Sequence, residues 1–244
     1  MADRSLRIQD DSDFRKWYRS SKAYRRRWVP HGIDQLSILR ALYRYRSFAA
    51  GTLLDLGCGT KKFADVYSGL VTAYWGVDLP TPELHRLHAV DIHADSGNLP
   101  IRSNSIATVV TIQVLGYVYD HESMLREIHR VLQPGGCLIL TYSQSGGSAG
   151  PDEYFHFTPS YYSRALKNAG LNVEILEART GTWGAIGETV STMMYYRNPM
   201  SGFGFRLRRL MCYVIQNAFS RLDGIWFLPH GAVGHIVIAR KPRL

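Results

Sequence analysis

The apolar residues of this chain recur with two different periods. Before residue 50 they recur at three- and four-residue steps in two stretches, 14–24 and 33–42, which Pro30-His31-Gly32 separates. Such steps predict amphipathic helices, and the Pro-His-Gly sequence predicts a break between them. From residue 51 the pattern changes to short apolar runs bounded by turn residues, which predict buried strands. These runs are TLLDL at 52–56, YWGVD at 74–78, SIATVVTI at 105–112, CLILTYS at 137–143, LNVEILEA at 171–178 and HIVIAR at 235–240.

Helical patterns occupy several of the intervals between these runs. The clearest covers 121–132, where the apolar residues fall on one face and Pro134 follows. A second begins after Thr158-Pro159 and continues to Gly170, which suits a helix cap. Strands that alternate with helices predict an α/β fold in which both faces of a parallel sheet are covered.

This alternation lapses between residues 180 and 233. Apolar residues at helical spacing extend there from Leu207 to Leu222, beside four arginines. We therefore expect a core over about 51–179 and 234–240, with a helical insertion before the last strand. A basic amphipathic helix of this kind suits peripheral contact with a membrane surface, and the alternative is burial in the wall of a pocket.

Charge is segregated along the chain. Lys and Arg outnumber Asp and Glu by 12 to 5 in residues 1–50 and by 7 to 1 in residues 200–244, whereas acidic residues lead by 14 to 10 between them. Basic flanks on a neutral-to-acidic body are typical of attachments that face an acidic partner or a membrane surface. An ordinary solvated surface is the alternative interpretation.

Several classes of protein are disfavoured. The apolar runs are shorter than a membrane span requires, and the first residues lack an apolar signal core, so we expect a cytoplasmic protein. The three cysteines are far apart and lack CxxC spacing, which argues against a disulfide framework or a cysteine zinc site. The spacing of His85, His88, Asp91 and His93 matches no established zinc pattern, so no metal is predicted.

The first predicted strand leads into a glycine turn, Asp55-Leu56-Gly57-Cys58-Gly59. A turn of this kind at the carboxyl edge of a sheet lets the backbone approach a ligand. Lys62 occupies the place of the third glycine in a dinucleotide fingerprint, which disfavours NAD and FAD. The carboxylate of Asp55 also suits a ligand that carries an ammonium or sulfonium group better than a pyrophosphate.

Two further carboxylates follow at predicted strand ends. Asp78 closes the second strand 21 residues after Gly57, at the spacing where an acidic side chain accepts hydrogen bonds from a ribose diol. Asp95 lies near the end of the presumed third strand and is suited to accept a hydrogen bond from an adenine amino group.

In this setting the chain resembles the class I S-adenosylmethionine-dependent methyltransferases, and in particular the small-molecule branch (methyltransferase type 11-like) that modifies glycans, quinones and secondary metabolites. The resemblance covers roughly residues 51–180 and the last strand. It rests on LLDLGCGT, YWGVDLP, DSGNLPIRSNSIATVV, QVLGYV, LREIHRVLQPGG and DEYFHFTPSYYSRALKNAGL, in that order. The fold it implies is a Rossmann-like, seven-stranded, mostly parallel sheet with an antiparallel last strand, and the cofactor it implies is S-adenosyl-L-methionine, with S-adenosyl-L-homocysteine as product.

The resemblance also implies roles for individual residues. The methionine part of the cofactor would be held by Asp55, Gly57 and Gly59. The ribose would be held by Asp78, and the adenine by Leu79, Asp95 and Ser96. Gln113 would lie beside the methyl group.

Departures from the family pattern point to possible catalytic residues. Lys61 replaces a glycine often found in such loops, which leaves tight packing there in question. Val114-Leu115-Gly116-Tyr117-Val118 stands where relatives commonly have VLEHV, so an acidic residue and a histidine are absent. His156 replaces an arginine and is a candidate general base, with a structural loop histidine as the alternative. Tyr117 is a candidate to orient the acceptor.

Two functions follow from this pattern. The favoured one is methyl transfer to a small-molecule, glycan or secondary-metabolite acceptor, with oxygen preferred as the methylated atom. Residues 1–50 and the 180–233 insertion would then form the lid and the acceptor pocket. The other is a non-catalytic or cofactor-binding module that acts on RNA or a protein partner through its basic flanks. The chain lacks the Asn/Asp-Pro-Pro-Tyr element of base N-methyltransferases, so methylation of nucleic-acid bases is disfavoured.

Overall fold

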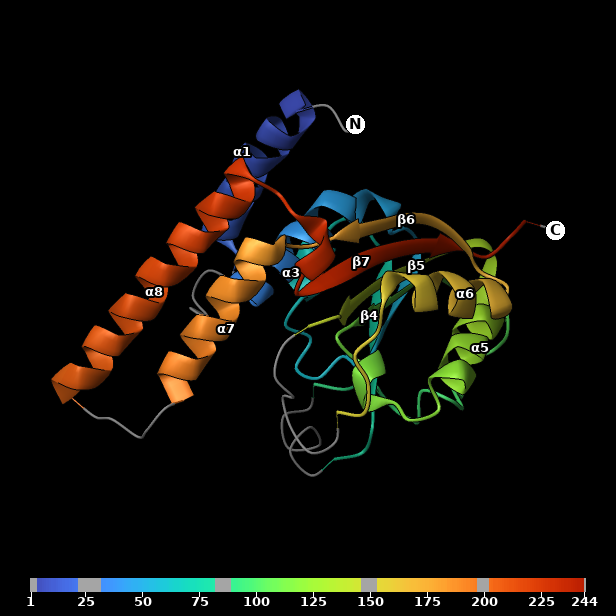
Figure 1. Cartoon of the computed structure of the whole chain (residues 1–244). Coiled ribbons are helices and arrows are strands. Elements are labelled where there is room, and N and C mark those ends of the chain that lie inside the picture. The colour runs from blue at the N-terminus through green and yellow to red at the C-terminus, as the bar shows by residue number, and fades with distance from the viewer. Residues whose placement is uncertain (1–3, 22–31, 82–88, 146–152, 197–201, 244) are drawn as a thin grey trace. The chain divides into compact units, whose positions relative to one another are not determined.

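The chain forms two compact units, which are described separately. A computed structural model describes residues 4–21, 32–81, 89–145, 153–196 and 202–243 (Figure 1). Residues 46–178 and 234–244 make the sheet unit, and residues 1–45 and 179–233 make the helical unit. Two segments expected from the sequence, the amino-terminal lid (1–50) and the insertion (180–233) in the second domain (51–244), thus belong largely to one unit. Their role as a lid stays a prediction.

The sheet unit is built on seven strands in the order β3-β2-β1-β4-β5-β7-β6. The first five strands pair in parallel, and β7 runs antiparallel to both β5 and β6. This topology confirms the expected mostly parallel sheet with an antiparallel last strand. The strands are β1 (Thr52–Leu56), β2 (Ala73–Asp78), β3 (Ile92–His93), β4 (Ile106–Ile112), β5 (Leu132–Ser143), β6 (Asn172–Ala178) and β7 (Gly234–Arg240).

Two α-helices of the sheet unit, α5 (His121–Val131) and α6 (Pro159–Asn168), start at side-chain caps. The Asp120 carboxylate accepts a hydrogen bond from the Ser123 amide at 3.0 Å, and Thr158 caps α6 with Pro159 in its first turn. Helix α5 ends one residue earlier than predicted, because the backbone of Leu132 is already extended and begins β5. Short 3-10 helices cover Arg46–Phe48, Ala64–Val66 and Leu115–Tyr117.

The main core of the sheet unit lies between the sheet and these two helices, which run along the same face (Figure 1). The predicted apolar face of α5 is buried there, and aliphatic residues of β5 and β7 face it. Its fully buried members include Leu125, Ile128, Leu138, Leu166 and Val237. Burying each such side chain stabilises the fold by roughly 1.5–3 kcal/mol.

The helical unit contains α1 (Arg4–Ser20), α3 (Gly32–Tyr45), α7 (Thr182–Tyr196), α8 (Gly202–Ile225) and a 3-10 helix at Pro229–Gly231. The ring of Phe14 is buried against Tyr43, 5.6 Å between ring centres. The guanidinium of Arg179 donates to Asp34 at 2.8 Å, which ties the start of this unit's second segment to α3. Among the described residues, no helix has the length and apolar character that crossing a bilayer requires.

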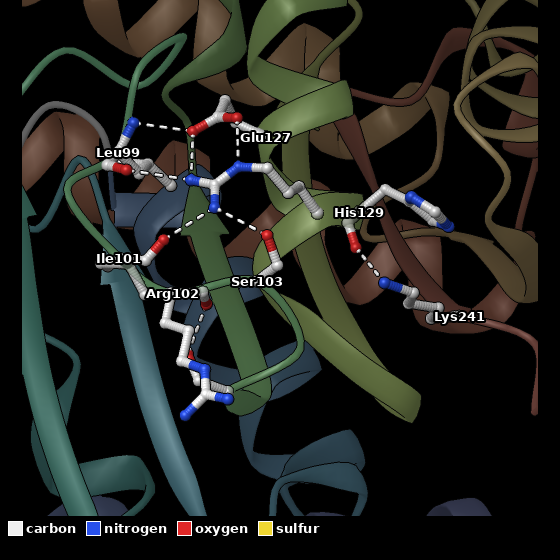
Figure 2. A network of polar contacts seen from close by, with 9 residues as sticks. Leu99, Ile101, Arg102, Ser103, Glu127, His129 and Lys241 are labelled. Carbon is white, nitrogen blue, oxygen red and sulfur yellow. Dashed lines mark hydrogen bonds and ion pairs between the residues drawn. The ribbon is translucent and has the colours of Figure 1, made fainter.

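A polar network joins α5 to the loop between β3 and β4 (Figure 2). The Arg130 guanidinium donates to the backbone oxygens of Leu99 at 2.9 Å and Ile101 at 2.7 Å, and to both carboxylate oxygens of Glu127 at 2.6 and 2.7 Å. Glu127 in turn accepts from the Leu99 amide at 2.7 Å. These hydrogen bonds lower the pKa of Glu127 and satisfy the backbone groups of a loop that has no regular structure.

Replacing Arg130 with alanine should lower the free energy of unfolding by about 2 kcal/mol, because two loop carbonyls lose their donor and the Glu127 carboxylate keeps only the Leu99 amide. Urea denaturation followed by circular dichroism measures this change. Arg126→Ala is the matched control, because Arg126 lies on the same helix with 62% of its side chain exposed and faces Glu122 at 3.8 Å. That variant should change stability by no more than about 0.5 kcal/mol. Equal losses in both variants would contradict the role of the network.

Candidate functional site

The glycine turn after β1 lies at the carboxyl edge of the sheet. Gly57 and Gly59 have positive φ angles of 76° and 51°. The amides of Gly57 and Cys58 both donate to the Val77 carbonyl, at 2.8 and 3.1 Å, so the turn is fastened to the end of β2. A β-carbon at Gly57 would collide with Val114, whereas one at Gly59 would meet nothing within 4 Å. Gly57 therefore permits close packing, and Gly59 leaves open space against its backbone.

Asp78 ends β2 directly beside this turn. One carboxylate oxygen accepts from the Gly59 amide at 2.7 Å, and the other accepts from the Leu79 amide at 2.8 Å. The two backbone donors fix the orientation of the carboxylate, and each oxygen keeps capacity for a further hydrogen bond. The structure thus brings Asp78 and Gly59 together, and the contact of Asp78 with a ribose stays a prediction.

Asp55 is buried, with 3% of its surface exposed, and accepts a hydrogen bond from the Tyr74 hydroxyl at 2.5 Å. Burial raises the pKa of the Asp55 carboxyl to about 6, against the opposing effect of the Tyr74 hydrogen bond. Burial and the nearby Asp55 carboxylate likewise raise the pKa of Tyr74. One oxygen of Asp55 is therefore already engaged within the protein, and its contact with a ligand stays a prediction.

Lys61 takes the place of a glycine in the methyltransferase pattern that the sequence resembles, and its backbone keeps the left-handed conformation that favours glycine. Its φ angle is 52°, and its ammonium group contacts the Asp91 carboxylate at 2.5 Å. A β-carbon at Gly76 would lie 2.5 Å from Cε of Lys61, so the absence of a side chain at Gly76 makes room for the lysine stem. The Gly76 amide also donates to Asp91 at 2.6 Å. The same β-carbon would lie 2.7 Å from Sγ of Cys58, so Gly76 makes room for both side chains.

Gln113 follows β4 with a positive φ of 60°. Its side-chain oxygen accepts from the Ser143 hydroxyl at 2.9 Å, while its side-chain nitrogen is buried and has no hydrogen-bond partner. A buried amide donor without a partner is costly and marks a position where a ligand can accept its hydrogen bond. Because β1, β2, β4 and β5 run parallel, Gln113 shares an edge of the sheet with Asp78 and the glycine turn.

The residues expected around adenine lie beyond β2 and β3. Leu79 is half exposed, Asp95 is exposed, and Ser96 is partly buried. The Ala94 amide donates to the Asp78 carbonyl at 3.1 Å, which places Asp95 next to the end of β2. Asp95 accepts from the Gly97 amide at 2.7 Å and so forms a local turn. Of the histidines considered as metal ligands, His85 and His88 lie outside the described residues.

The two candidate catalytic residues come together around Glu153. The segment that starts at Glu153 is fixed by the Tyr154 amide, which donates to the Gly116 carbonyl at 2.7 Å. Nε2 of His156 lies 3.4 Å from Oε1 of Glu153. Burial and the Glu153 charge raise the pKa of the neighbouring Tyr117. The loop after β4 and the segment before α6 therefore share one cluster of hydroxyl, carboxylate and imidazole groups.

Sequence reasoning missed the partners of these residues. Tyr74 and Asp91 were not singled out as partners of Asp55 and Lys61, and Ser143 was not connected with Gln113. Their contacts depend on strand register, since Asp55 lies opposite Gly76 on the neighbouring strand, two residues beyond Tyr74. The alternation of side chains in β2 is the signal that could have indicated that Tyr74 and Asp55 share a face.

The raised pKa of Asp55 predicts a specific pH dependence of stability. Because the folded protein favours the protonated carboxyl, the contribution of Asp55 is fully present below about pH 4 and is lost as the pH rises through about 6. As the pH rises from about 4 to 7, the Asp55→Asn variant should therefore become about 3 kcal/mol more stable relative to the unmodified protein.

Urea denaturation across this pH range measures the difference. Tyr74→Phe is an informative counterpart, because losing the hydrogen bond should move the loss of stability to higher pH. A pH-independent difference between Asp55→Asn and the unmodified protein would contradict the assignment.

Comparison with known proteins finds similarity over this part of the chain. Residues 54–140 match the Methyltransf_11 family, a methyltransferase domain. A Mycolicibacterium smegmatis protein named as a probable S-adenosylmethionine-dependent methyltransferase is 28% identical over 138 residues, covering 52% of this chain and 54% of that protein. The malonyl-(acyl-carrier protein) O-methyltransferase of Alcanivorax borkumensis is 32% identical over 136 residues, covering 51% and 46%. The chain thus spans about half the length of the curated relatives it matches.

Solved structures agree at the level of the fold. An S-adenosylmethionine-dependent methyltransferase from Mesorhizobium loti has a TM-score of 0.53 and 18% identity, covering 86% of this chain and 100% of that one. The (4+2)-cyclase SpnF has a TM-score of 0.56 and 20% identity, covering 86% and 81%. The chain therefore shares the fold of these solved structures, and its residues 54–140 match a methyltransferase family model.

Proposed function

We propose that this protein binds S-adenosyl-L-methionine at the carboxyl edge of its sheet and directs methyl transfer to a hydroxyl group of a small-molecule or glycan acceptor. The observation that carries the proposal is the pairing of Asp78 with Gly59. A carboxylate held by two backbone amides faces the same turn whose backbone is open at Gly59. This arrangement suits a ribose diol beside an extended amino-acid moiety.

The donor set fits this cofactor. The two oxygens of Asp78 have capacity for two hydroxyl donors, and the unpaired side-chain nitrogen of Gln113 offers a donor at the same edge. Near neutral pH the Asp55 carboxyl is mostly ionised, since its pKa is about 6, and its charge suits an ammonium group. When bound, S-adenosyl-L-methionine supplies a methyl group activated by a positively charged sulfur. The protein then has to align an acceptor and exclude water.

The acceptor side is assigned to the cluster of Tyr117, Glu153 and His156. A neutral His156 accepts the proton that a hydroxyl acceptor loses, and Glu153 at 3.4 Å stabilises the resulting imidazolium. Tyr117 orients the acceptor through its hydroxyl group. Tyr119 and Tyr154 lie in edge contact beside this cluster, 75% and 52% exposed, and offer aromatic faces for a sugar or another ring.

Oxygen is favoured as the methylated atom for two reasons. A nearby histidine and carboxylate are useful when the acceptor must lose a proton, and one relative is named as an O-methyltransferase. The alternative is a module that binds the cofactor without transferring its methyl group and acts on RNA or a protein partner. It predicts cofactor binding with no methylated product for any acceptor.

Asp78→Ala should weaken binding of S-adenosyl-L-homocysteine at least tenfold, because it removes charge-assisted hydrogen bonds to the ribose. Isothermal titration calorimetry measures the dissociation constant, and circular dichroism checks the fold. The control is Glu122→Gln, which removes an exposed carboxylate on α5 and should leave the constant unchanged. Unchanged affinity in Asp78→Ala would show that this carboxylate does not hold the ribose.

His156→Ala should lower kcat by roughly two to four orders of magnitude without changing cofactor affinity, which is the usual contribution of a general base. Tyr117→Phe should reduce kcat less, since a phenol of raised pKa orients a hydroxyl rather than accepting its proton. Transfer of labelled methyl groups to a panel of hydroxylated metabolites and glycans is the assay. His129→Gln, at the far end of α5, serves as the control and should leave kcat unchanged. Full turnover in both site variants would assign proton removal to another group.

A further inference from the structure

Helix α8 has two apolar faces, and only one of them is packed. The packed face carries Cys212 and Gln216, which are buried, and the Cys212 thiol lies 3.5 Å from the Ser191 carbonyl of α7. Helices α7 and α8 lie side by side in Figure 1. A second set of residues recurs at three- and four-residue steps on another face of α8. This set, called the exposed stripe, comprises Leu207, Met211, Val214, Ala218, Leu222 and Ile225.

Each member of the exposed stripe is open to solvent in the structure. Val214 is 57% exposed and Ile225 is 84% exposed, and the neighbouring Leu210 is 56% exposed. Single exposed apolar residues are ordinary, but a continuous stripe over more than four helical turns marks an interaction surface. The alternative considered from the sequence, burial of this helix in a pocket wall, therefore does not describe its outer face.

The exposed charges of helices α7 and α8 have one sign. In the parts of α7 and α8 whose side chains the structure describes, every exposed charged residue is an arginine, namely Arg206, Arg209 or Arg221. The acidic residues of these helices are not exposed. Glu188 is buried, and Asp223 accepts hydrogen bonds from backbone amides at the start of α7.

We propose that the exposed stripe of α8 docks on the surface of a membrane that contains anionic phospholipid. Aliphatic side chains enter the boundary between headgroups and acyl chains, and the arginines pair with lipid phosphates. Two copies of the chain are a poorer match, because pairing the stripes would bring arginines together with no exposed carboxylate on these helices to oppose them. A nucleic acid would match the arginines but leave the aliphatic residues without a partner.

Aromatic residues reinforce this assignment. Tyr213 is 60% exposed along α8, and Trp226 and Phe227, just past its end, are 61% and 45% exposed. Tyrosine and tryptophan favour the membrane interface because they combine an apolar ring with a polar group. The helix lies on the surface rather than crossing it, in keeping with the finding that no described helix meets the requirements of a membrane span.

Co-sedimentation of the full chain with lipid vesicles tests this proposal. We expect binding to vesicles of phosphatidylcholine with about one-third phosphatidylglycerol, and at least tenfold weaker binding to phosphatidylcholine alone or at high salt. Arg206→Gln and Arg221→Gln should each weaken binding about fivefold. The double variant Val214→Glu, Ile225→Glu should lose at least tenfold more affinity than Asn217→Glu, Ser220→Glu, which adds the same charge at exposed positions of α8 outside the stripe.

Cofactor titration and circular dichroism accompany each variant, so that loss of folding or of the proposed methyl transfer is distinguished from loss of docking. Absence of binding to the anionic vesicles would overturn the proposal, as would equal binding of the two double variants. A dimer in analytical ultracentrifugation that the stripe variant alone dissolves would also overturn it, because the stripe would then join two copies of the chain.

Discussion

The bond between the Asp78 carboxylate and the Gly59 amide is the constraint on which the site depends. A left-handed glycine turn at the end of β1 leaves backbone amides without partners in the strand ladder, and the end of β2 supplies acceptors for them. The turn is thereby oriented before any ligand arrives, and the carboxylate is oriented by the turn. Because the turn and the carboxylate are already oriented, less conformational entropy is lost when a ligand binds.

The burial of Asp55, unlike the bond between Asp78 and Gly59, is unfavourable for the ionised carboxylate. Its carboxylate sits under the turn with Tyr74 as partner, and its raised pKa means that the ionised form is less favourable there than in water. A protein that only needed to be stable would gain by placing a neutral residue at this position. Retaining a charge in a buried place beside an open turn is the pattern expected where a cationic ligand compensates for it.

The sequence predicted the sheet well because its strands are short apolar runs that end at turn residues. It did not predict where β5 begins, since Leu132 belongs by its spacing to the apolar face of α5 and by its backbone to the strand. The two-residue β3 is too short to produce a pattern, so Asp95 could be placed only near the end of a presumed third strand. The outer face of α8 could not be assigned, because both of its faces are apolar and periodicity alone does not say which is packed.

The arrangement of Lys61 over Gly76 links positions on different elements of the fold. The lysine stem occupies the space that a side chain at position 76 would fill, and Asp91 neutralises the ammonium group at its end. A larger residue at 76 would displace the lysine stem and would also press on Cys58, and a glycine at 61 would leave Asp91 without its cationic partner. Positions 61, 76 and 91 are therefore linked, so that a substitution at one of them changes the space or the charge that the other two meet.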